Sequence, residues 1–203
     1  YFMLDNYVNG DAQADDAYAG ADNPANFQLD EYKIASTNSN VSRDWGYLYS
    51  TIGKANRVIN NAEFVEDEML DDERRDQIVA EAKFIRAYCY FHLVQLFGDV
   101  PLVTTEVTAI NAENITEVFP LLFPERQSAE AVYEQIVSDL EDALPNVRIT
   151  APDKGFATKG AVNALLTKVY ATRIPQDWAK VIEHADAVIS GGYTLLAEYD
   201  QCG

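Results

Sequence analysis

The sequence predicts an all-α protein in which helical hairpins pack around one central, aromatic-rich helix. Apolar residues recur every three or four positions in five stretches, and helix-capping or helix-ending residues flank most of them. No stretch shows the strict alternation of a half-buried strand. We expect a single domain over residues 1–203, divided into an acidic segment (1–41), a helical core (42–97), an irregular connection (98–127) and helical hairpins (128–191).

The first long helix is predicted where apolar periodicity begins, after the polar run "ASTNSNVSRD". Ser42 or Asp44 is the expected cap, because short polar side chains accept hydrogen bonds from the first free N–H groups of a helix. Trp45 begins the stripe and is therefore assigned to the core. The stripe consists of Trp45, Leu48, Tyr49, Ile52, Ala55, Ile59 and Ala62.

The second helix is predicted over residues 72–97, and its second half is apolar on more than one face. Such helices lie between other elements, so this one is expected to be central. Gly98 follows the last apolar residue and should have a positive φ or lie in a tight turn, and Pro101 prevents continuation. The side chains expected to be mostly buried are Phe84, Tyr88, Phe91 and Leu96.

Three further helices are expected after the irregular connection. One begins at Ser128 and ends before Pro145, one begins at Thr158, and the last begins at Trp178 and ends at the glycine pair 191–192. The last two form a pair of tetratricopeptide length, a unit that stacks into scaffolds with exposed binding surfaces. Trp178 is assigned to the core of this pair rather than to a ligand platform.

The net charge of -18 argues against nucleic acid and anionic membrane surfaces as partners. The acidic excess is marked near "GDAQADDAYAGADN" (10–23), which suits a solvated face, a cation site or a partner-facing patch. The alternatives stay open, and the sequence identifies no metal ligands. Cys89 and Cys202 form neither a CxxC pair nor a disulfide framework.

No catalytic signature is present: the nucleotide-binding, phosphate-binding, zinc-protease and serine-hydrolase motifs are all missing. His92 and His184 each lack a second histidine at ligand spacing, and His92 is interpreted as structural. Asp139, Glu141 and Asp142 are interpreted as a solvated face. We therefore expect no enzyme activity and no cofactor, although a pair of carboxylates as in glycosidases is not excluded by counting.

Four segments together resemble the SusD/RagB family of surface glycan- and nutrient-binding lipoproteins. "EAKFIRAYCYFHLVQLFGDVPLVT" is similar to the family's signature helix and turn. The others follow in the family's order: "WGYLYSTIGKANRVI", "PERQSAEAVYEQIVSDLEDALP" and "ATKGAVNALLTKVYA" with "DWAKVIEHADAVISGGYTLL". The similarity covers residues 11–196, and the family's amino-terminal half consists of tetratricopeptide-like helix pairs. Family members are longer, so we expect a fragment or a processed form.

The resemblance implies a surface component of an outer-membrane uptake complex that captures an oligosaccharide or other nutrient. In this family the partner is a TonB-dependent transporter. Membrane attachment would use only a lipid anchor, which is absent from this chain. The alternative is a tetratricopeptide-type scaffold that binds protein without glycan, and a more distant one is an α-helical glycoside hydrolase.

The loop before the Trp45 helix is rich in residue types that bind sugars, although a capped loop entering a helix has the same composition. By analogy with the family, the resemblance implies that this loop lies on the ligand-facing side. Polar side chains would bind sugar hydroxyls and an aromatic ring would stack on a sugar face. The predicted ligand-binding residues are Tyr32, Asn38, Asn40, Arg43 and Asp44.

Overall fold

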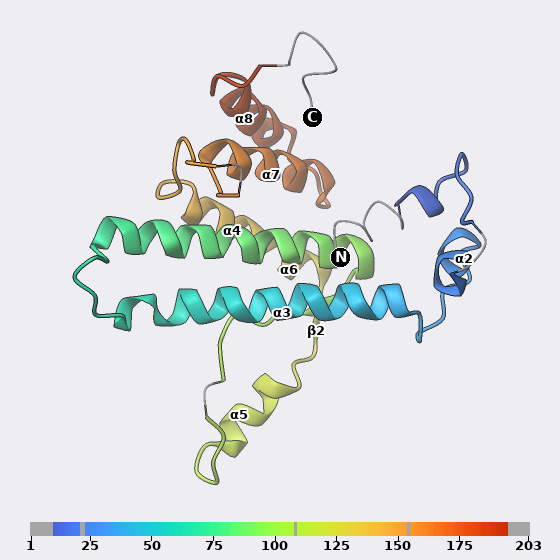
Figure 1. Ribbon diagram of the computed structural model, residues 1–203, viewed down its shortest axis with the longest axis horizontal. Helices are drawn as coiled ribbons and strands as arrows, with labels where there is room; N and C mark the ends of the chain where they lie inside the picture. Colours follow the sequence, from blue (N-terminus) through green and yellow to red (C-terminus); the bar gives the residue numbers. More distant parts are fainter. Residues whose placement is uncertain (1–9, 21–22, 108, 154, 195–203) are drawn as a thin grey trace. The chain divides into compact units, whose positions relative to one another are not determined.

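The computed structural model describes residues 10–20, 23–107, 109–153 and 155–194, and this part is almost entirely helical (Figure 1). Its only two strands, β1 (Val100–Pro101) and β2 (Arg126–Gln127), form one short antiparallel pair. The predicted all-α class is therefore confirmed. Within these ranges, no helix combines the length and the hydropathy that crossing a bilayer requires.

The chain divides into two compact units, residues 1–51 and 52–203. Helix α3 (Ser39–Asn61) contributes to both. The prediction of a single folding domain stays a prediction.

In the first unit, α2 (Pro24–Asp30) precedes α3, although only an acidic segment was expected here. The helix is short, so its two buried residues produce no long periodic signal. Asn23 caps α2, because its side chain accepts a hydrogen bond from the Ala25 N–H, and a proline occupies the first turn.

The predicted caps of α3, Ser42 and Asp44, are wrong. The helix begins three residues earlier than Ser42, and Asn38 caps it. The Asn38 Oδ1 accepts hydrogen bonds from the backbone N–H groups of Asn40 and Val41, at 3.0 and 3.2 Å. The apolar stripe began only at Trp45, so periodicity placed the helix start too late.

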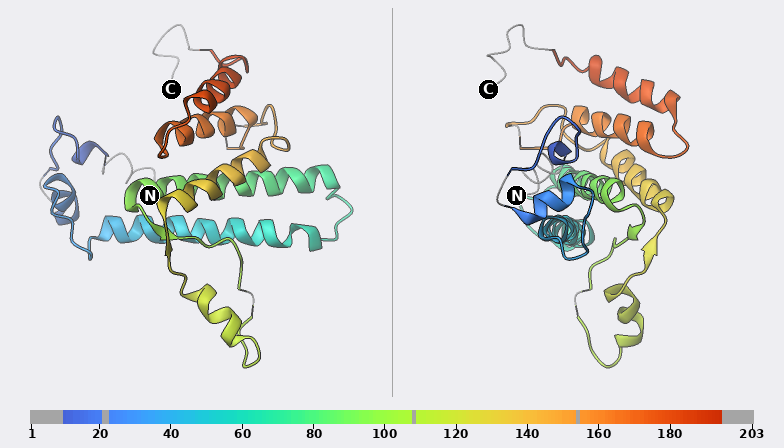
Figure 2. Two further views of the ribbon diagram at one scale, coloured as in Figure 1. Left: turned by 180° about the vertical axis from the view of Figure 1, so that it is seen from behind. Right: turned by 90° about the vertical axis from the view of Figure 1, so that its right-hand side faces the viewer.

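The second unit stacks its helices in chain order. Helix α4 packs most extensively on α6, α6 packs on α7, and α7 packs on α8 (Figures 1 and 2). Ser128, Thr158 and Asp177 each cap a helix through the side chain, and the first two were predicted helix starts. The helices are α4 (Asp72–Phe97), α6 (Ala129–Ala143), α7 (Lys159–Thr172) and α8 (Trp178–Ile189), with the 3-10 helix η1 (Ala62–Phe64) before α4.

Helix α4 is central to this unit, as predicted, since it contacts η1, β1, α6 and α7. Phe91 is buried, whereas Phe84 and Tyr88 are half-buried. The prediction for Leu96 is wrong, because its side chain is 49% exposed. Leu96 lies in the last turn of α4, which neighbouring elements cover less completely than the middle of the helix.

Gly98 ends α4 as predicted. Its φ is 67°, its ψ is -121°, and its N–H donates to the Val94 carbonyl at 3.0 Å. A side chain at this position would be strained, because L-residues rarely adopt such a φ. Val100 then enters β1, where it pairs with Gln127.

The connection between α4 and α6 was expected to be irregular, and this is wrong over eight residues. Helix α5 (Ile115–Leu122) forms there with Pro120 inside it. The proline removes one backbone donor but leaves the other hydrogen bonds of the helix possible. The β1–β2 pair closes the base of this connection, and α5 lies beyond it, away from α4 and α6 (Figure 2).

The prediction that Trp178 is a core residue is also wrong, because its side chain is 62% exposed. It begins α8, whose only buried residue is His184. Helix α8 packs on α7, and apart from His184 the residues of α8 are half-buried or exposed.

Candidate functional site

Tyr32 has an unusual backbone conformation at the end of α2. Its φ is 52°, and among the described non-glycine residues it alone has a positive φ. The Tyr32 N–H donates to the Leu29 carbonyl at 3.2 Å, which closes the helix in the manner usually provided by glycine. A bulky side chain in this conformation costs about 1–2 kcal/mol. Tyr32 therefore places a tyrosine side chain on a strained backbone.

The Tyr32 ring is held in place and yet is 70% exposed. Its hydroxyl donates a hydrogen bond to the Gln13 carbonyl at 2.6 Å. The hydrogen bond of the hydroxyl restricts the ring, so less side-chain entropy remains to be lost on binding. A fixed, exposed aromatic face is suited to stacking on the apolar face of a sugar.

Asn38 lies at the junction of α2 and α3 and is buried, with 3% of its surface exposed. Its Nδ2 donates to the Ala25 carbonyl and to Gln28 Oε1, both at 3.0 Å. Its Oδ1 caps α3, as described above. Both ends of this amide are therefore used within the protein, and they hold the two helices together.

The remaining predicted residues lie just beyond this junction. Asn40 is buried, donates to Asn26 Oδ1 at 2.7 Å and accepts from Arg43 Nη2 at 3.0 Å. Asp44 is buried, and Arg43 is half-buried. Of the five predicted ligand residues, only Tyr32 is well exposed. Asn38 and Asn40 serve the loop architecture, and the ligand role of all five stays a prediction.

Tyr18 is a further exposed aromatic residue of this unit and was not among the predicted ligand-binding residues. Its ring lies 6.1 Å from the Phe27 ring of α2, measured between centroids. The segment that carries it is tied to α2, because the Ala19 N–H donates to Asp30 Oδ2 at 3.1 Å. The feature of the sequence that could have indicated Tyr18 is that it is the one aromatic residue inside the acidic run 10–23.

The acidic run itself shows no metal centre in its described part. Asp11, Asp15 and Asp16 are exposed. In the described ranges, no three or more His, Cys, Asp or Glu side chains lie together in a group that could hold a metal ion. These observations fit a solvated face.

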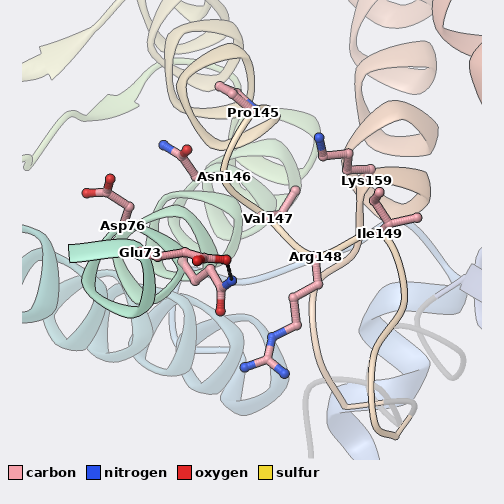
Figure 3. A pocket seen from close by; sticks show the side chains of 9 residues that line it. Glu73, Asp76, Pro145, Asn146, Val147, Arg148, Ile149 and Lys159 are labelled. Carbon is pink, nitrogen blue, oxygen red and sulfur yellow. Dashed lines mark hydrogen bonds between the residues drawn. The ribbon is translucent and has the colours of Figure 1, made fainter. Parts of the chain in front are cut away.

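A cleft of about 540 Å³ lies in the second unit, at the start of α4 and the connection from α6 to α7 (Figure 3). Glu73 and Asp76 line one side, and Arg148 and Lys159 come from the connection and the start of α7. The Arg148 guanidinium lies over the Phe156 ring, 4.9 Å from its centroid. Both carboxylate residues are exposed, so neither has the apolar surroundings of a glycosidase general acid.

The interpretation of Asp139 as part of a solvated face is wrong. It is 1% exposed and forms a two-point ion pair with Arg86, at 2.6 and 2.8 Å. The second Asp139 partner is Gln135, and Arg86 also donates to Asn56 Oδ1 at 2.8 Å. This network joins α4, α6 and the second half of α3. The buried charge of Asp139 therefore has a structural explanation in its pairing with Arg86 and needs no catalytic one.

Comparison with known proteins identifies the family to which this helical architecture belongs. The family model SusD-like_3, described as "Starch-binding associating with outer membrane", matches residues 5–171. The chain belongs to this SusD-like family. The resemblance in the four sequence segments is thereby confirmed, and family members are surface proteins associated with the outer membrane.

Individual SusD-like relatives match over most of this chain but only part of their own length. SusD-like protein P2 of Formosa agariphila is 33% identical over 80% of this chain and 30% of the relative. A SusD-like protein of Bacteroides ovatus is 29% identical over 81% of this chain and 28% of the relative. The chain thus spans about a third of the curated relatives that it matches.

Two solved structures that are similar to this chain are named with a carbohydrate. A "Laminarin binding SusD-like protein" is 28% identical with a TM-score of 0.81, covering 97% of this chain and 42% of that chain. A structure "with xylogluco-oligosaccharide" is 25% identical with a TM-score of 0.76, covering 98% of this chain and 40% of that chain.

Proposed function

We propose that this protein is the glycan-binding component of an outer-membrane uptake complex and is not an enzyme. It captures an oligosaccharide at the cell surface and delivers it to a TonB-dependent transporter. Membership of the SusD-like family and the ligands named for two similar structures support this proposal. The observation that carries it is the exposed, anchored ring of Tyr32 on a strained backbone.

In this proposal the five predicted residues have two kinds of role. Tyr32 stacks on the ligand, and Arg43 offers guanidinium donors to sugar hydroxyls. Asn38, Asn40 and Asp44 are buried, so they contribute through the shape of the loop. Charged hydrogen bonds are stronger than neutral ones, which gives Arg43 the larger polar contribution.

Replacement of Tyr32 by glycine tests the stacking role without adding strain. Glycine accepts the positive φ, so the variant loses the ring and its bond to Gln13 while the backbone strain is relieved. Loss of an aromatic contact of about 1–1.5 kcal/mol should weaken binding roughly tenfold. The measurement is calorimetry on the full-length protein with laminarin and xyloglucan oligosaccharides.

Tyr47→Ala is the matched control, since Tyr47 is also an exposed tyrosine of the first unit but lies on a regular helix. Its affinity should equal that of the wild type. Equal affinity of Tyr32→Gly and wild type would remove Tyr32 from the site. Failure of the wild type to bind any glycan would favour the protein-binding scaffold, and release of reducing sugar would contradict the non-enzymatic assignment.

A further inference from the structure

The cleft at the start of α4 carries opposite charges on its two sides, and we call it the charged cleft (Figure 3). The α4 side presents Glu73 and Asp76, which lie three residues apart and therefore share a helix face. The other side presents Arg148, from the connection after α6, and Lys159, the first residue of α7. Three further residues give the lining an apolar part: Pro145, Val147 and Ile149.

The opposite charges of the charged cleft do not neutralise one another. No ion pair joins its two sides, and neither Asp76 nor Lys159 forms one with any residue that the structure describes. Arg148 Nε lies 3.5 Å from Glu81 Oε1, but neither atom has a hydrogen-bond partner among the described residues. The cleft therefore holds cations and anions apart on facing sides.

The cationic side is held in place by contacts within the protein. The Lys159 N–H donates to the Arg148 carbonyl at 2.8 Å, so the backbone keeps the two cationic residues next to each other. The Arg148 guanidinium lies over the Phe156 ring, 4.9 Å from its centroid, and 23% of the Arg148 side chain is exposed. Because this side chain is already restricted, it loses less entropy when it binds a carboxylate.

We propose that the charged cleft binds a short peptide with free amino and carboxyl ends. The peptide carboxylate lies against Arg148 and Lys159, and the peptide ammonium lies against Glu73 and Asp76, so that each end forms charge-assisted hydrogen bonds. The volume of about 540 Å³ is within the range of about 300–1,000 Å³ of small-molecule sites. The apolar lining residues contact the side chains of the peptide.

Other ligand classes match this charge arrangement less well. An anion without an ammonium group faces Glu73 and Asp76, and a cation without a carboxylate faces Arg148 and Lys159. A neutral sugar leaves all four charges without a counter-charge. Charge complementarity therefore selects a ligand that carries both signs. The charged cleft belongs to the second unit, and the inference does not depend on glycan binding at the Tyr32 surface.

The first experiment compares four forms of trialanine by calorimetry on the full-length protein. One form has free ends, one is acetylated at the amino end, one is amidated at the carboxyl end, and one is blocked at both. Each single block should weaken binding at least tenfold, because it removes a charge that faces unpaired groups. Cellotriose, a neutral sugar, should not displace the free-ended peptide. Equal affinity of the four forms, absence of binding by the free-ended form, or displacement by cellotriose overturns the proposal.

Two variants assign the ends of the peptide to the sides of the charged cleft. Asp76→Asn should reduce the loss of affinity caused by acetylation, and Lys159→Met should reduce the loss caused by amidation. Neither side chain is buried, so both variants should fold. The matched controls are Asp186→Asn and Lys180→Met on α8, outside the cleft, which should leave both losses unchanged. Unchanged losses in the two cleft variants overturn the proposal.

Thiol labelling shows whether the charged cleft is open in the full-length protein and whether the peptide occupies it. Ile149 lines the cleft and is 73% exposed. Ile149→Cys should react rapidly with a maleimide, followed by mass spectrometry of the peptide that contains residue 149. Free-ended trialanine should slow this reaction, and doubly blocked trialanine should not. Slow reaction without peptide would show that another part of the protein fills the cleft, and absence of protection would place the peptide elsewhere; either result overturns the proposal.

Discussion

Asp139 and Arg86 illustrate how a single polar residue can be misjudged when only its neighbours in sequence are known. Asp139 sits beside two other acidic residues of the same helix, and its buried partner lies 53 residues away. A buried charge is tolerated only when it is paired and hydrogen-bonded. Here each carboxylate oxygen accepts a guanidinium N–H, and Gln135 donates to one of them.

Replacement of Asp139 by alanine should strongly destabilise the protein, because it leaves the Arg86 guanidinium buried without its counter-charge. The expected loss is about 3–5 kcal/mol in the free energy of unfolding, measured by urea denaturation. Asp142→Ala is the control, since Asp142 pairs with Lys83 at 3.0 Å but its side chain is well exposed. That change should cost at most about 1 kcal/mol. Similar losses for the two variants would contradict the role assigned to Asp139.

Replacement by alanine is expected to have opposite effects on stability at Gly98 and at Gly53. Gly98→Ala should destabilise by about 1–3 kcal/mol, because the positive φ strains an L-residue even though no atom lies within 4 Å of the added carbon. Gly53→Ala lies on the exposed side of regular helix α3 and should stabilise by up to about 1 kcal/mol. Thermal melts of both variants check this pair, and a neutral Gly98→Ala would refute the capping argument.

At the scale of elements, the α7–α8 pair depends on a buried histidine. His184 Nδ1 lies 2.9 Å from Asn163 Oδ1, and its ring stacks on Tyr170 at 5.7 Å between centroids. Asn163 Nδ2 donates to a backbone carbonyl, so its Oδ1 faces the histidine as an acceptor. His184 Nδ1 therefore carries the proton. His184 Nε2 is buried and has no hydrogen-bond partner among the described residues.

Burial lowers the pKa of His184, with Lys180 acting in the same direction and Glu183 and Glu141 opposing it. In the unfolded chain, His184 binds a proton near the ordinary histidine pKa of about 6.5. In the folded protein, His184 stays neutral to lower pH. The contribution of neutral His184 to the free energy of unfolding is therefore complete above about pH 7. It decreases as the pH falls through about 6.5 toward the lower pKa of His184 in the folded protein.

The variant His184→Gln should show a smaller loss of stability between about pH 7 and pH 5 than the wild type, measured by urea denaturation. Burial also lowers the pKa of His92, but that residue remains in both proteins, so the difference reports on His184. Identical pH profiles would show that protonation of His184 is not linked to unfolding.

At the scale of the whole molecule, the charge of -18 is the dominant electrostatic property. Most described ion pairs are at the surface, where such pairs contribute little. Repulsion among the unpaired carboxylates therefore opposes the compact state.

Raising the salt concentration should raise the melting temperature. From about 0.01 M to about 0.15 M, the Debye length shortens from about 30 Å to about 8 Å, which screens this repulsion. Differential scanning calorimetry at the two concentrations provides the measurement. A fall in melting temperature would mean that attractive surface pairs outweigh the net charge.

The positions of the long helices, apart from the start of α3, and the family could be determined from the sequence, because their signals are local. The limits of α4, its glycine end and the caps Ser128 and Thr158 depend on backbone groups within a few residues. The four family segments likewise reside in contiguous sequence. Short helices α2 and α5 escaped detection, since each is too brief to establish a period of 3.6 residues.

Only the tertiary structure decided which polar and apolar side chains are exposed. Asn38 and Asn40 have the composition of a sugar site, but their donors are used by Ala25, Gln28 and Asn26 of the preceding helix. Asp139 is buried and paired with Arg86, and Trp178 is exposed because α8 packs on α7 through another part of its surface. Burial is set by partners distant along the chain, and neither composition nor periodicity specifies where those partners lie.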